Sequence, residues 1–334
     1  RESHRRVKIG RPEIRGEGGR TTWSVAVESG AGARRLWYEL PDEHAEMLDD
    51  TCDAAVAALL LPAMARGERI VVAGALSAAL HHALSGPYQA LVRQVIPRLE
   101  RVEIRAGEVR QAIGAPQGVA TGFSAGIDSY AVLADYLDGQ VPPGLRVTHL
   151  LFNDVGSHEP GGEPVFLARR DRLRPVAERL GLPLVEVRSN LDAFYGPDLH
   201  YLLTHTPRNA SVALLLQGGI GRFYYASTYP FAKLFVGETF SLAFCDAIAL
   251  PLLSTETLTA QSVGSEYTRV EKTLRVAEVE ESHATLDVCV DPMGAAGRTN
   301  CSRCTKCART MLTLEIAGLL DRYEASFDLG AWRA

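Results

Sequence analysis

Residues 124–129 combine residue types that suit the binding of an anion. They read Ser-Ala-Gly-Ile-Asp-Ser and lie between a strand-like segment, 118–123, and a helix-like segment, 129–137. Gly126 permits backbone angles that other residues resist, and Ala125 keeps side-chain bulk away. Successive amides of such a turn, and those of the following helix start, can donate hydrogen bonds to phosphate oxygens. The pattern therefore predicts a phosphate cradle.

Three side chains of the same turn carry oxygen atoms. Ser124 and Ser129 add hydroxyl donors, whereas Asp128 would repel a phosphate unless it caps the helix or helps to hold Mg²⁺. An ordinary strand–turn–helix with Ser and Asp as caps uses the same residues. So does a serine hydrolase, in which Ser124 of Gly-Phe-Ser-Ala-Gly would be the nucleophile. No Lys follows the turn, so it is not a Walker-type loop.

Four of the six cysteines form a second group, with the spacing C-x11-C-x2-C-x2-C. They are Cys289, Cys301, Cys304 and Cys307. Four thiolates satisfy tetrahedral Zn²⁺, and the short spacings let neighbouring ligands surround one ion. A disulfide framework or an iron–sulfur cluster would use the same residues. We expect a structural zinc site, because four cysteines leave no open position for a substrate. Arg303, Lys306 and Arg309 could offset the negative charge of the thiolates.

Several polar residues near predicted strand ends and helix starts are further candidates. Arg269 and Lys272 lie three residues apart in a helical pattern, and they form either a solvated helix face or a pair that neutralises leaving pyrophosphate. Arg208 begins another helical pattern, where it could contact phosphate through two hydrogen bonds or simply be exposed. Asn153 and Ser227 follow predicted strands and could line a nucleotide pocket, although Asn153 could equally form an Asx turn.

Three histidines lie in loop-like segments near predicted strand ends. These are His158, His200 and His205. Each could serve as a base, or be a surface polar group. Cys52 and Cys245 read as small buried apolar residues.

Two different patterns of elements position these residues. Residues 7–40 read as a β meander with Gly-rich turns, and Asp42 stands as the N-cap of a long helix over 43–67. A strand (69–74), a helix (77–99) and a strand (101–106) complete an N-terminal α+β domain, 1–114.

From residue 118 onward, strands alternate with helices. Expected strands are 118–123, 146–153, 183–189, 222–228 and 285–290, and expected helices are 129–137, 164–181, 208–221, 266–278 and 309–323. Apolar, β-branched strands that alternate with helices imply a doubly wound parallel sheet covered on both faces. The second domain is therefore 115–334, with the cysteine segment at its C-terminal end.

Composition narrows the class of protein. The 334 residues are 46% hydrophobic and 22% charged, and the net charge of −5 gives no global reason to bind nucleic acid. No run of about 18 apolar residues predicts a membrane span. The basic start has no apolar segment behind it, so no secretory signal is expected. Clustered cysteines favour metal binding in a reducing cytoplasm.

The turn at 124–129 resembles the pyrophosphatase loop, Ser-Gly-Gly-x-Asp-Ser, of the adenine nucleotide α-hydrolase-like superfamily. Members of that superfamily bind ATP and cleave it between the α and β phosphates, usually to adenylate an oxygen of a carboxylate or amide. Ala125 stands where the family has its first Gly, and its methyl group is tolerated if the φ angle of that residue is negative.

With "PRN" at 207–209 opening a helix and the C-terminal cysteines, residues 117–315 resemble the 7-cyano-7-deazaguanine synthase family. That family uses ATP and ammonia to convert a carboxylate into an amide and then a nitrile, with a structural zinc. This chain lacks a "YPDC"-type segment after the fourth strand and has an additional N-terminal domain. The resemblance thus implies a divergent relative with a different substrate.

The resemblance implies an AMP-forming ligase that uses ATP, Mg²⁺, a small-molecule acceptor and ammonia or an amine, with a homodimer possible. Asp128, Arg208, Arg269 and Lys272 would be catalytic. ATP would contact Ser124, Ala125, Gly126, Ile127, Asp128, Ser129, Asn153 and Ser227. A thiolating tRNA-modifying enzyme, a serine hydrolase and a non-catalytic nucleotide sensor are the alternatives.

Overall fold

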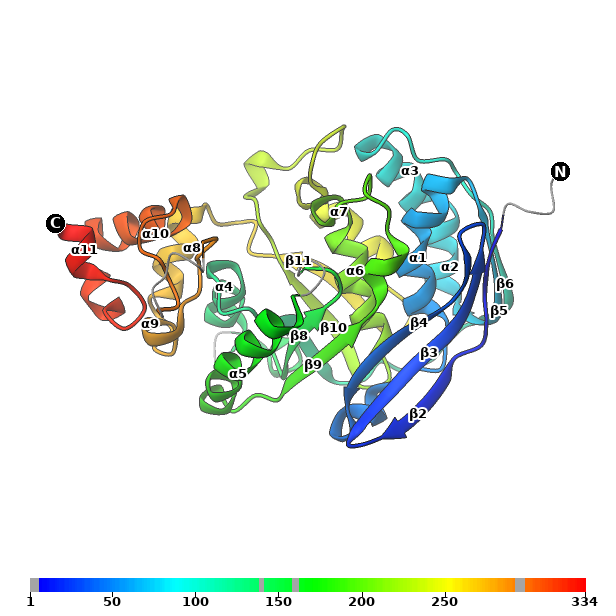
Figure 1. The fold of residues 1–334 in the computed structure, drawn as a ribbon, viewed down its shortest axis with the longest axis horizontal. Helices are drawn as coiled ribbons and strands as arrows, with labels where there is room; N and C mark the ends of the chain where they lie inside the picture. Colours follow the sequence, from blue (N-terminus) through cyan, green and yellow to red (C-terminus); the bar gives the residue numbers. More distant parts are fainter. Residues whose placement is uncertain (1–5, 138–140, 158–161, 292–297) are drawn as a thin grey trace.

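The computed structural model describes residues 6–137, 141–157, 162–291 and 298–334, and its strands form a single eleven-stranded sheet (Figure 1). The strands are β1 (Arg6–Ile9), β2 (Glu13–Glu17), β3 (Arg20–Ser29), β4 (Gly32–Pro41), β5 (Arg69–Ser77), β6 (Ile104–Arg110), β7 (Gly118–Gly122), β8 (His149–Asp154), β9 (Leu184–Ser189), β10 (Ile220–Ala226) and β11 (Thr259–Val263). Their order is β11-β10-β7-β8-β9-β4-β3-β1-β5-β6, and β2 pairs with β3.

Most strand pairs are parallel, which confirms the mixed α/β class. The five strands from β11 to β9 pair in parallel, as do β1 with β5 and β5 with β6. Every antiparallel pair among the described residues involves β3 or β4. The apolar strands are buried because helices cover the sheet. In chain order these helices are α1 (Asp53–Arg66), α2 (Ala78–Ser85), α3 (Pro87–Val95), α4 (Ile127–Tyr136), α5 (Glu163–Leu180), α6 (Tyr201–Leu215), α7 (Asp246–Ala249), α8 (Arg269–Val276), α9 (Ser282–Thr285), α10 (Thr305–Ile316) and α11 (Leu329–Arg333).

The N-terminal strands continue the sheet of the second half of the chain. β4 and β9 pair antiparallel through Tyr38 with Ser189 and Glu39 with Arg188. The Tyr38 hydroxyl also lies 2.8 Å from Oγ of Ser211 on α6, and one apolar core joins α1 with α6. The sheet and this core thus extend across residue 114, and the division at that residue remains a prediction.

Two predicted helices are interrupted, the first where a tertiary contact is made and the second at the local Gly86-Pro87 pair. Residues 43–67 form a 3₁₀ helix, Asp42–Met47, and then α1, and the indole of Trp23 donates to the carbonyl of Asp49 between them. Asp42 accepts from the Thr21 hydroxyl (2.6 Å) rather than capping a helix. The helix expected over 77–99 divides at Gly86 into α2 and α3.

Three further differences lie near the predicted site. α6 begins at Tyr201, so the "PRN" segment lies within this helix rather than opening it. Residues 285–290 do not form a strand, whereas β11 was not expected.

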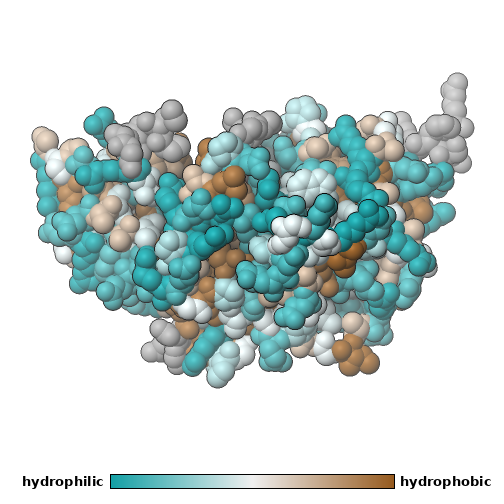
Figure 2. Space-filling model, turned by 60° about the horizontal axis from the view of Figure 1, so that its bottom comes forward, coloured by the Kyte–Doolittle hydropathy of each residue, from teal (hydrophilic) through white to brown (hydrophobic). Residues whose placement is uncertain are grey.

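The C-terminal helices gather at one end of the molecule (Figure 1), where α8 packs against both α4 and α10. On the face shown in Figure 2, hydrophilic side chains predominate and apolar residues lie in separate areas between them. Within the described ranges, no helix combines the length and apolar character needed to cross a bilayer.

Candidate functional site

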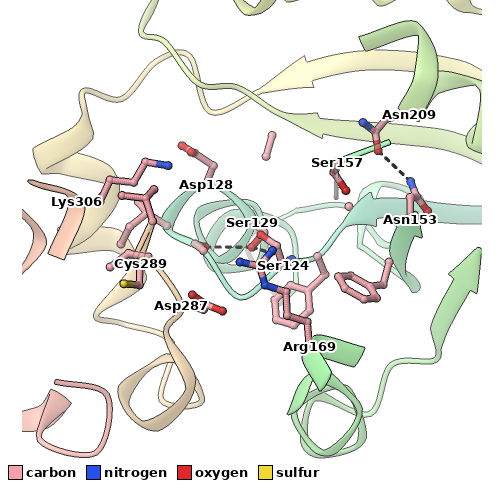
Figure 3. A pocket seen from close by; sticks show the side chains of 18 of the residues that line it. Ser124, Asp128, Ser129, Asn153, Ser157, Arg169, Asn209, Asp287, Cys289 and Lys306 are labelled. Carbon is pink, nitrogen blue, oxygen red and sulfur yellow. Dashed lines mark hydrogen bonds between the residues drawn. The ribbon is translucent and has the colours of Figure 1, made fainter. Parts of the chain in front are cut away.

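A cleft of about 590 Å³ opens at the carboxyl ends of β7, β8 and β10 (Figure 3). The turn from β7 to α4 forms its floor, and residues of α6 and of the β8 and β10 ends form one wall. The opposite wall comes from α8, from residues 287–290 and from α10. In parallel α/β sheets this edge is where ligands bind.

The unusual backbone angle of the turn lies on Ala125, not on Gly126. Ala125 has a φ of 56°, so the condition under which its methyl group would be tolerated without strain is not met, whereas Gly126 is extended (φ −83°, ψ 170°). A left-handed alanine costs about 1–2 kcal/mol. The Asp287 amide helps to hold this conformation by donating to the Ala125 carbonyl at 2.9 Å. Together with Ser302 in the cysteine segment, Ala125 is one of two non-glycine residues with positive φ in the described chain.

The start of α4 carries no side-chain cap. The Ser129 hydroxyl donates to the Gly126 carbonyl (3.0 Å) and accepts from the Ser124 amide (3.4 Å). Asp128 points elsewhere, so the capping role weighed for it is not observed. The first amides of the helix are left available to a ligand in the cleft.

Asp128 joins the two basic residues that the sequence singled out. Its Oδ2 accepts from Arg269 at 2.9 Å, and its Oδ1 accepts from Lys272 at 3.0 Å. Lys272 is only 2% exposed and also donates to the Ser227 hydroxyl at 2.9 Å. Burial lowers the pKa of Lys272, while Asp128 opposes that change. Four predicted site residues therefore meet at one place, and Lys272 is not part of a solvated face.

The capping box at the start of α8 explains the orientation of Arg269 and Lys272. The Thr268 hydroxyl accepts from the Glu271 amide, and the Glu271 carboxylate accepts from the Thr268 amide. The box fixes the first turn, where Arg269 and Lys272 project toward α4.

Three more cations line the cleft: Arg169 on α5, and Lys306 and Arg309 on α10. None of the three forms an ion pair with an acidic side chain within the described part of the chain. Burial and the charge of Arg269 lower the pKa of Arg309. Sequence reasoning assigned Lys306 and Arg309 only to the thiolates and did not single out Arg169. The carboxylates of Asp128 and Asp287 also line the cleft, but four cations against two carboxylates leave a net positive charge near the helix start, which favours an anionic ligand.

The wall formed by α6 and the ends of β8 and β10 is neutral and hydrogen-bonded. Asn153 donates to Oδ1 of Asn209 at 3.1 Å, and Asn209 donates to the Tyr201 hydroxyl at 3.2 Å. Tyr225, at the end of β10, also lines the cleft. Asn153 is thus in the predicted place. Asn209 belongs to the quoted "PRN" segment but was not assigned to the site, and Tyr201 and Tyr225 were missed because isolated Tyr residues carry no spacing signal.

Arg208 does not line the cleft. It is 1% exposed, donates to the Val155 carbonyl (3.0 Å) and to Asp192 (2.8 Å), and lies over the Tyr195 ring. A Cβ added to Gly156 would lie 2.0 Å from its Nη1 atom. Arg208 therefore supports the backbone after β8, and the structure does not place it for the phosphate contact expected of it.

The histidines differ in position. His205 is buried, with Nδ1 2.7 Å from the Tyr225 hydroxyl, and burial together with Arg208 lowers its pKa to about 4. His200 is the exposed residue before α6. His158 lies outside the described residues.

The four C-terminal cysteines converge as predicted, with all four sulfur atoms within 4.8 Å of one another. The Sγ–Sγ distances are 3.9 Å for Cys301 with Cys307 and 3.4 Å for Cys304 with Cys307. Tetrahedral zinc–sulfur bonds of about 2.3 Å require sulfur separations of about 3.8 Å. Amides of Cys301 and Cys304 donate to sulfur atoms of the group, which stabilises thiolates. The cluster could therefore bind a structural metal such as zinc.

The cysteine cluster also forms part of the cleft. Cys289 lines it, and Cys304 is the N-cap of α10, which carries Lys306 and Arg309. Cys52 and Cys245 are buried apolar residues, as expected.

No family model, curated protein or solved structure matches this chain. The functional argument therefore depends on the geometry of the cleft.

Proposed function

We propose that the protein is an ATP-dependent, AMP-forming ligase of the adenine nucleotide α-hydrolase-like type. One observation carries this proposal: the uncapped turn between β7 and α4 faces a cleft lined by four cations, of which Arg169, Lys306 and Arg309 form no salt bridge among the described residues. A triphosphate supplies the negative charge that this arrangement lacks. The serine-rich turn after a parallel strand is the feature that the resemblance connects with pyrophosphate release.

The phosphates would lie on residues 124–129, with Arg169, Lys306 and Arg309 around them. Both carboxylate oxygens of Asp128 already accept from cations, so Asp128 would orient Arg269 and Lys272 toward the leaving pyrophosphate. Mg²⁺, held largely by the phosphates themselves, would neutralise further charge. The neutral wall at Asn153 would face the nucleoside or the acceptor.

The reaction then needs little covalent chemistry from the protein. An acceptor oxygen attacks the α phosphorus, the bond to the β phosphate breaks, and pyrophosphate leaves. Ammonia or an amine displaces AMP from the activated acceptor. Positioning and charge stabilisation supply the rate enhancement.

Two alternatives find less support in the geometry. A serine hydrolase needs a base near Ser124, and no described histidine lines the cleft. A thiolating enzyme needs an accessible cysteine pair, whereas each of the six cysteines is either buried alone or part of the cluster.

ATP–pyrophosphate exchange tests the proposal, with small carboxylates and purine-like acids as the acceptor panel. We expect exchange that requires Mg²⁺ and at least one acceptor, and protection of the protein by a non-hydrolysable ATP analogue. Labelling of Ser124 by a fluorophosphonate, with no exchange and no protection, would contradict it.

A further inference from the structure

A row of hydrogen-bonding side chains leads from the cleft into the interior of the protein. It begins at Tyr225, whose ring lines the cleft at the end of β10. The Tyr225 hydroxyl lies 2.7 Å from Nδ1 of His205, and the two rings are stacked, with an interplanar angle of 9°. A neutral imidazole can accept at Nδ1, and in that tautomer the phenol donates to it.

The row continues through α6 to α7. Oγ1 of Thr206 lies 3.3 Å from Nδ1 of His205 and donates to Oδ1 of Asp246 at 2.6 Å. Thr206 is 0% exposed and Asp246 is 1% exposed. Oδ2 of Asp246 has no hydrogen-bond partner within the described structure. A buried carboxyl group with one hydrogen bond lowers the stability of the folded protein, so its presence calls for a functional explanation.

Ion pairing does not explain Asp246, since no cationic side chain of the described residues forms a salt bridge with it. Instead its neighbours form a continuous path of proton-exchanging atoms to the cleft. Every step of that path is a contact of 3.3 Å or less.

We propose that Tyr225 is a catalytic acid–base residue for the step in which an amine displaces AMP, and that His205, Thr206 and Asp246 form the relay that takes up the proton. This assignment rests on the proposed function, in which the nucleophile carries an N–H proton that it must release at that step, whereas a thiolate has no proton to release. The relay also indicates that the second substrate is ammonia or a primary amine rather than a thiolate.

The proton balance is complete within these side chains. As the amine nitrogen bonds to the acceptor carbon, AMP leaves with the electron pair of the carbon–oxygen bond. The nitrogen gives one proton to the Tyr225 oxygen while Tyr225 passes its own to Nδ1 of His205. The proton on Nδ1 moves to Thr206, whose hydroxyl proton moves to Asp246. After product release the same path returns the proton to water in the cleft.

The pKa shifts of Asp246 and His205 agree with proton transfer from Tyr225 toward Asp246. Burial raises the pKa of Asp246 to about 7, so its carboxylate can take up a proton near neutral pH. The low pKa of His205 prevents the proton from remaining on the imidazole. Titratable groups facing Asp246 are Tyr88, Cys245 and Tyr225. Burial raises the pKa of each of them, so all three are neutral at that pH, and Arg208 is the charge that acts on His205.

Measuring the two half-reactions separately tests the relay. The variants to compare are Tyr225→Phe and Thr206→Val, with an acceptor that supports exchange. Thr206 does not line the cleft, so Thr206→Val should keep ATP–pyrophosphate exchange within about twofold. Both variants should lose ammonium-dependent AMP formation by about 100-fold, the scale of general acid–base catalysis. Thr206→Ser keeps the hydroxyl and should restore that rate. His205→Gln should lose ammonium-dependent AMP formation as Thr206→Val does, and its matched control, His200→Gln, should behave as the unaltered protein does.

The pH profile distinguishes a relay from a structural role. At constant free ammonia, AMP formation should rise with pH around the pKa of Asp246, and Asp246→Asn should remove this rise. An infrared carbonyl band that titrates near pH 7 and disappears in Asp246→Asn should be visible without any substrate.

The outcomes separate this inference from the proposed function. Absence of exchange in the unaltered protein would overturn both, whereas normal aminolysis in Tyr225→Phe would overturn the relay alone. An Asp246 carboxyl group that stays ionised down to pH 5 would also overturn the relay, whatever the exchange assay shows.

Discussion

Two strand-to-helix junctions in the same sheet use similar residues in opposite ways. At the β5–α2 junction, the Ser77 amide donates to Oδ1 of Asp53 at 2.9 Å, and the Ser77 hydroxyl donates to Oδ2 of the same carboxylate. The Ala79 amide donates to Glu256 at 2.8 Å. The protein itself thus supplies the acidic groups that the amides of a helix start prefer. We call the β5–α2 junction the closed junction for this reason.

At the β7–α4 junction, no described acidic side chain accepts from the first amides of the helix. The only carboxylate of the turn, Asp128, faces Arg269 and Lys272 instead. Comparison of the two junctions shows that a serine at a strand end is not itself a binding signal. The β7–α4 junction, which we call the open junction, differs because no acidic side chain of the described residues binds the amides of its helix start. This difference supports the proposal of a phosphate site.

The largest expected effect comes from breaking the open junction. Asp128→Asn should lower ATP–pyrophosphate exchange by at least about 100-fold, because both cations lose the carboxylate that orients them. Thermal unfolding should change little.

Asp135→Asn provides the control, since Asp135 also joins α4 to α8, through Arg275 at 2.7 Å, but does not line the cleft. Equal losses of exchange in the two variants would show that helix packing, not the turn, sets the rate.

Breaking the closed junction should affect stability and not chemistry. Asp53→Ala leaves the buried Ser77 and Gln217 groups unpaired, and we expect a loss of about 3 kcal/mol in the free energy of unfolding by urea. Exchange per folded molecule should be unchanged. Asp50→Ala, which removes an exposed partner of Arg110, should cost less than about 0.5 kcal/mol.

Removal of the metal should weaken the wall that faces the open junction. Chelation should release the start of α10, move Lys306 and Arg309, and weaken ATP binding by about tenfold, or about 1.4 kcal/mol. Calorimetric titration with the metal-loaded and chelated protein measures this difference, and added zinc should reverse it. Cys52→Ser, outside the cluster, should bind metal and ATP normally, and unchanged affinity after chelation would contradict the coupling.

The smallest effect should come from the backbone of the turn itself. Ala125→Gly relieves a left-handed alanine but adds chain entropy to the unfolded state, so we expect a net gain of about 0.5 kcal/mol in stability. Gly126→Ala should be close to neutral for folding, because its φ of −83° suits alanine and the nearest contacts of an added Cβ are at 3.4 Å. Chemical denaturation of both variants checks the assignment, and a destabilised Ala125→Gly would contradict it.

The sequence predicted the class of fold and part of the candidate site. Alternating apolar strands and helices, the turn at 124–129 and the cysteine spacing are local patterns, so they could be recognised without tertiary information. The continuity of the sheet could not, because the pairing of β4 with β9 joins residues about 150 positions apart in the chain. The helix break after Met47 accompanies a contact between separate segments, Trp23 with Asp49, whereas the break at Gly86 coincides with a local Gly-Pro pair.

The site residues also divide into those that a local pattern marks and those whose position depends on tertiary contacts. The contact of Asp128 with Arg269 and Lys272 spans more than 140 residues, yet each partner lies in a recognisable segment. Arg208 misled the prediction because an arginine in a helix pattern gives no information about its burial. Lys306 and Arg309 were noticed only for their closeness to the thiolates, since the sequence does not show that the cysteine segment folds over the cleft.

The short seam between β4 and β9 has a consequence for any attempt to shorten the chain. A fragment that starts at residue 115 would leave the outer backbone of β9 bare, and bare strand edges recruit one another. The amino-terminal strands thus act as a protective border for the second half of the sheet. Solubility of that fragment, not its chemistry, is what their loss would damage first.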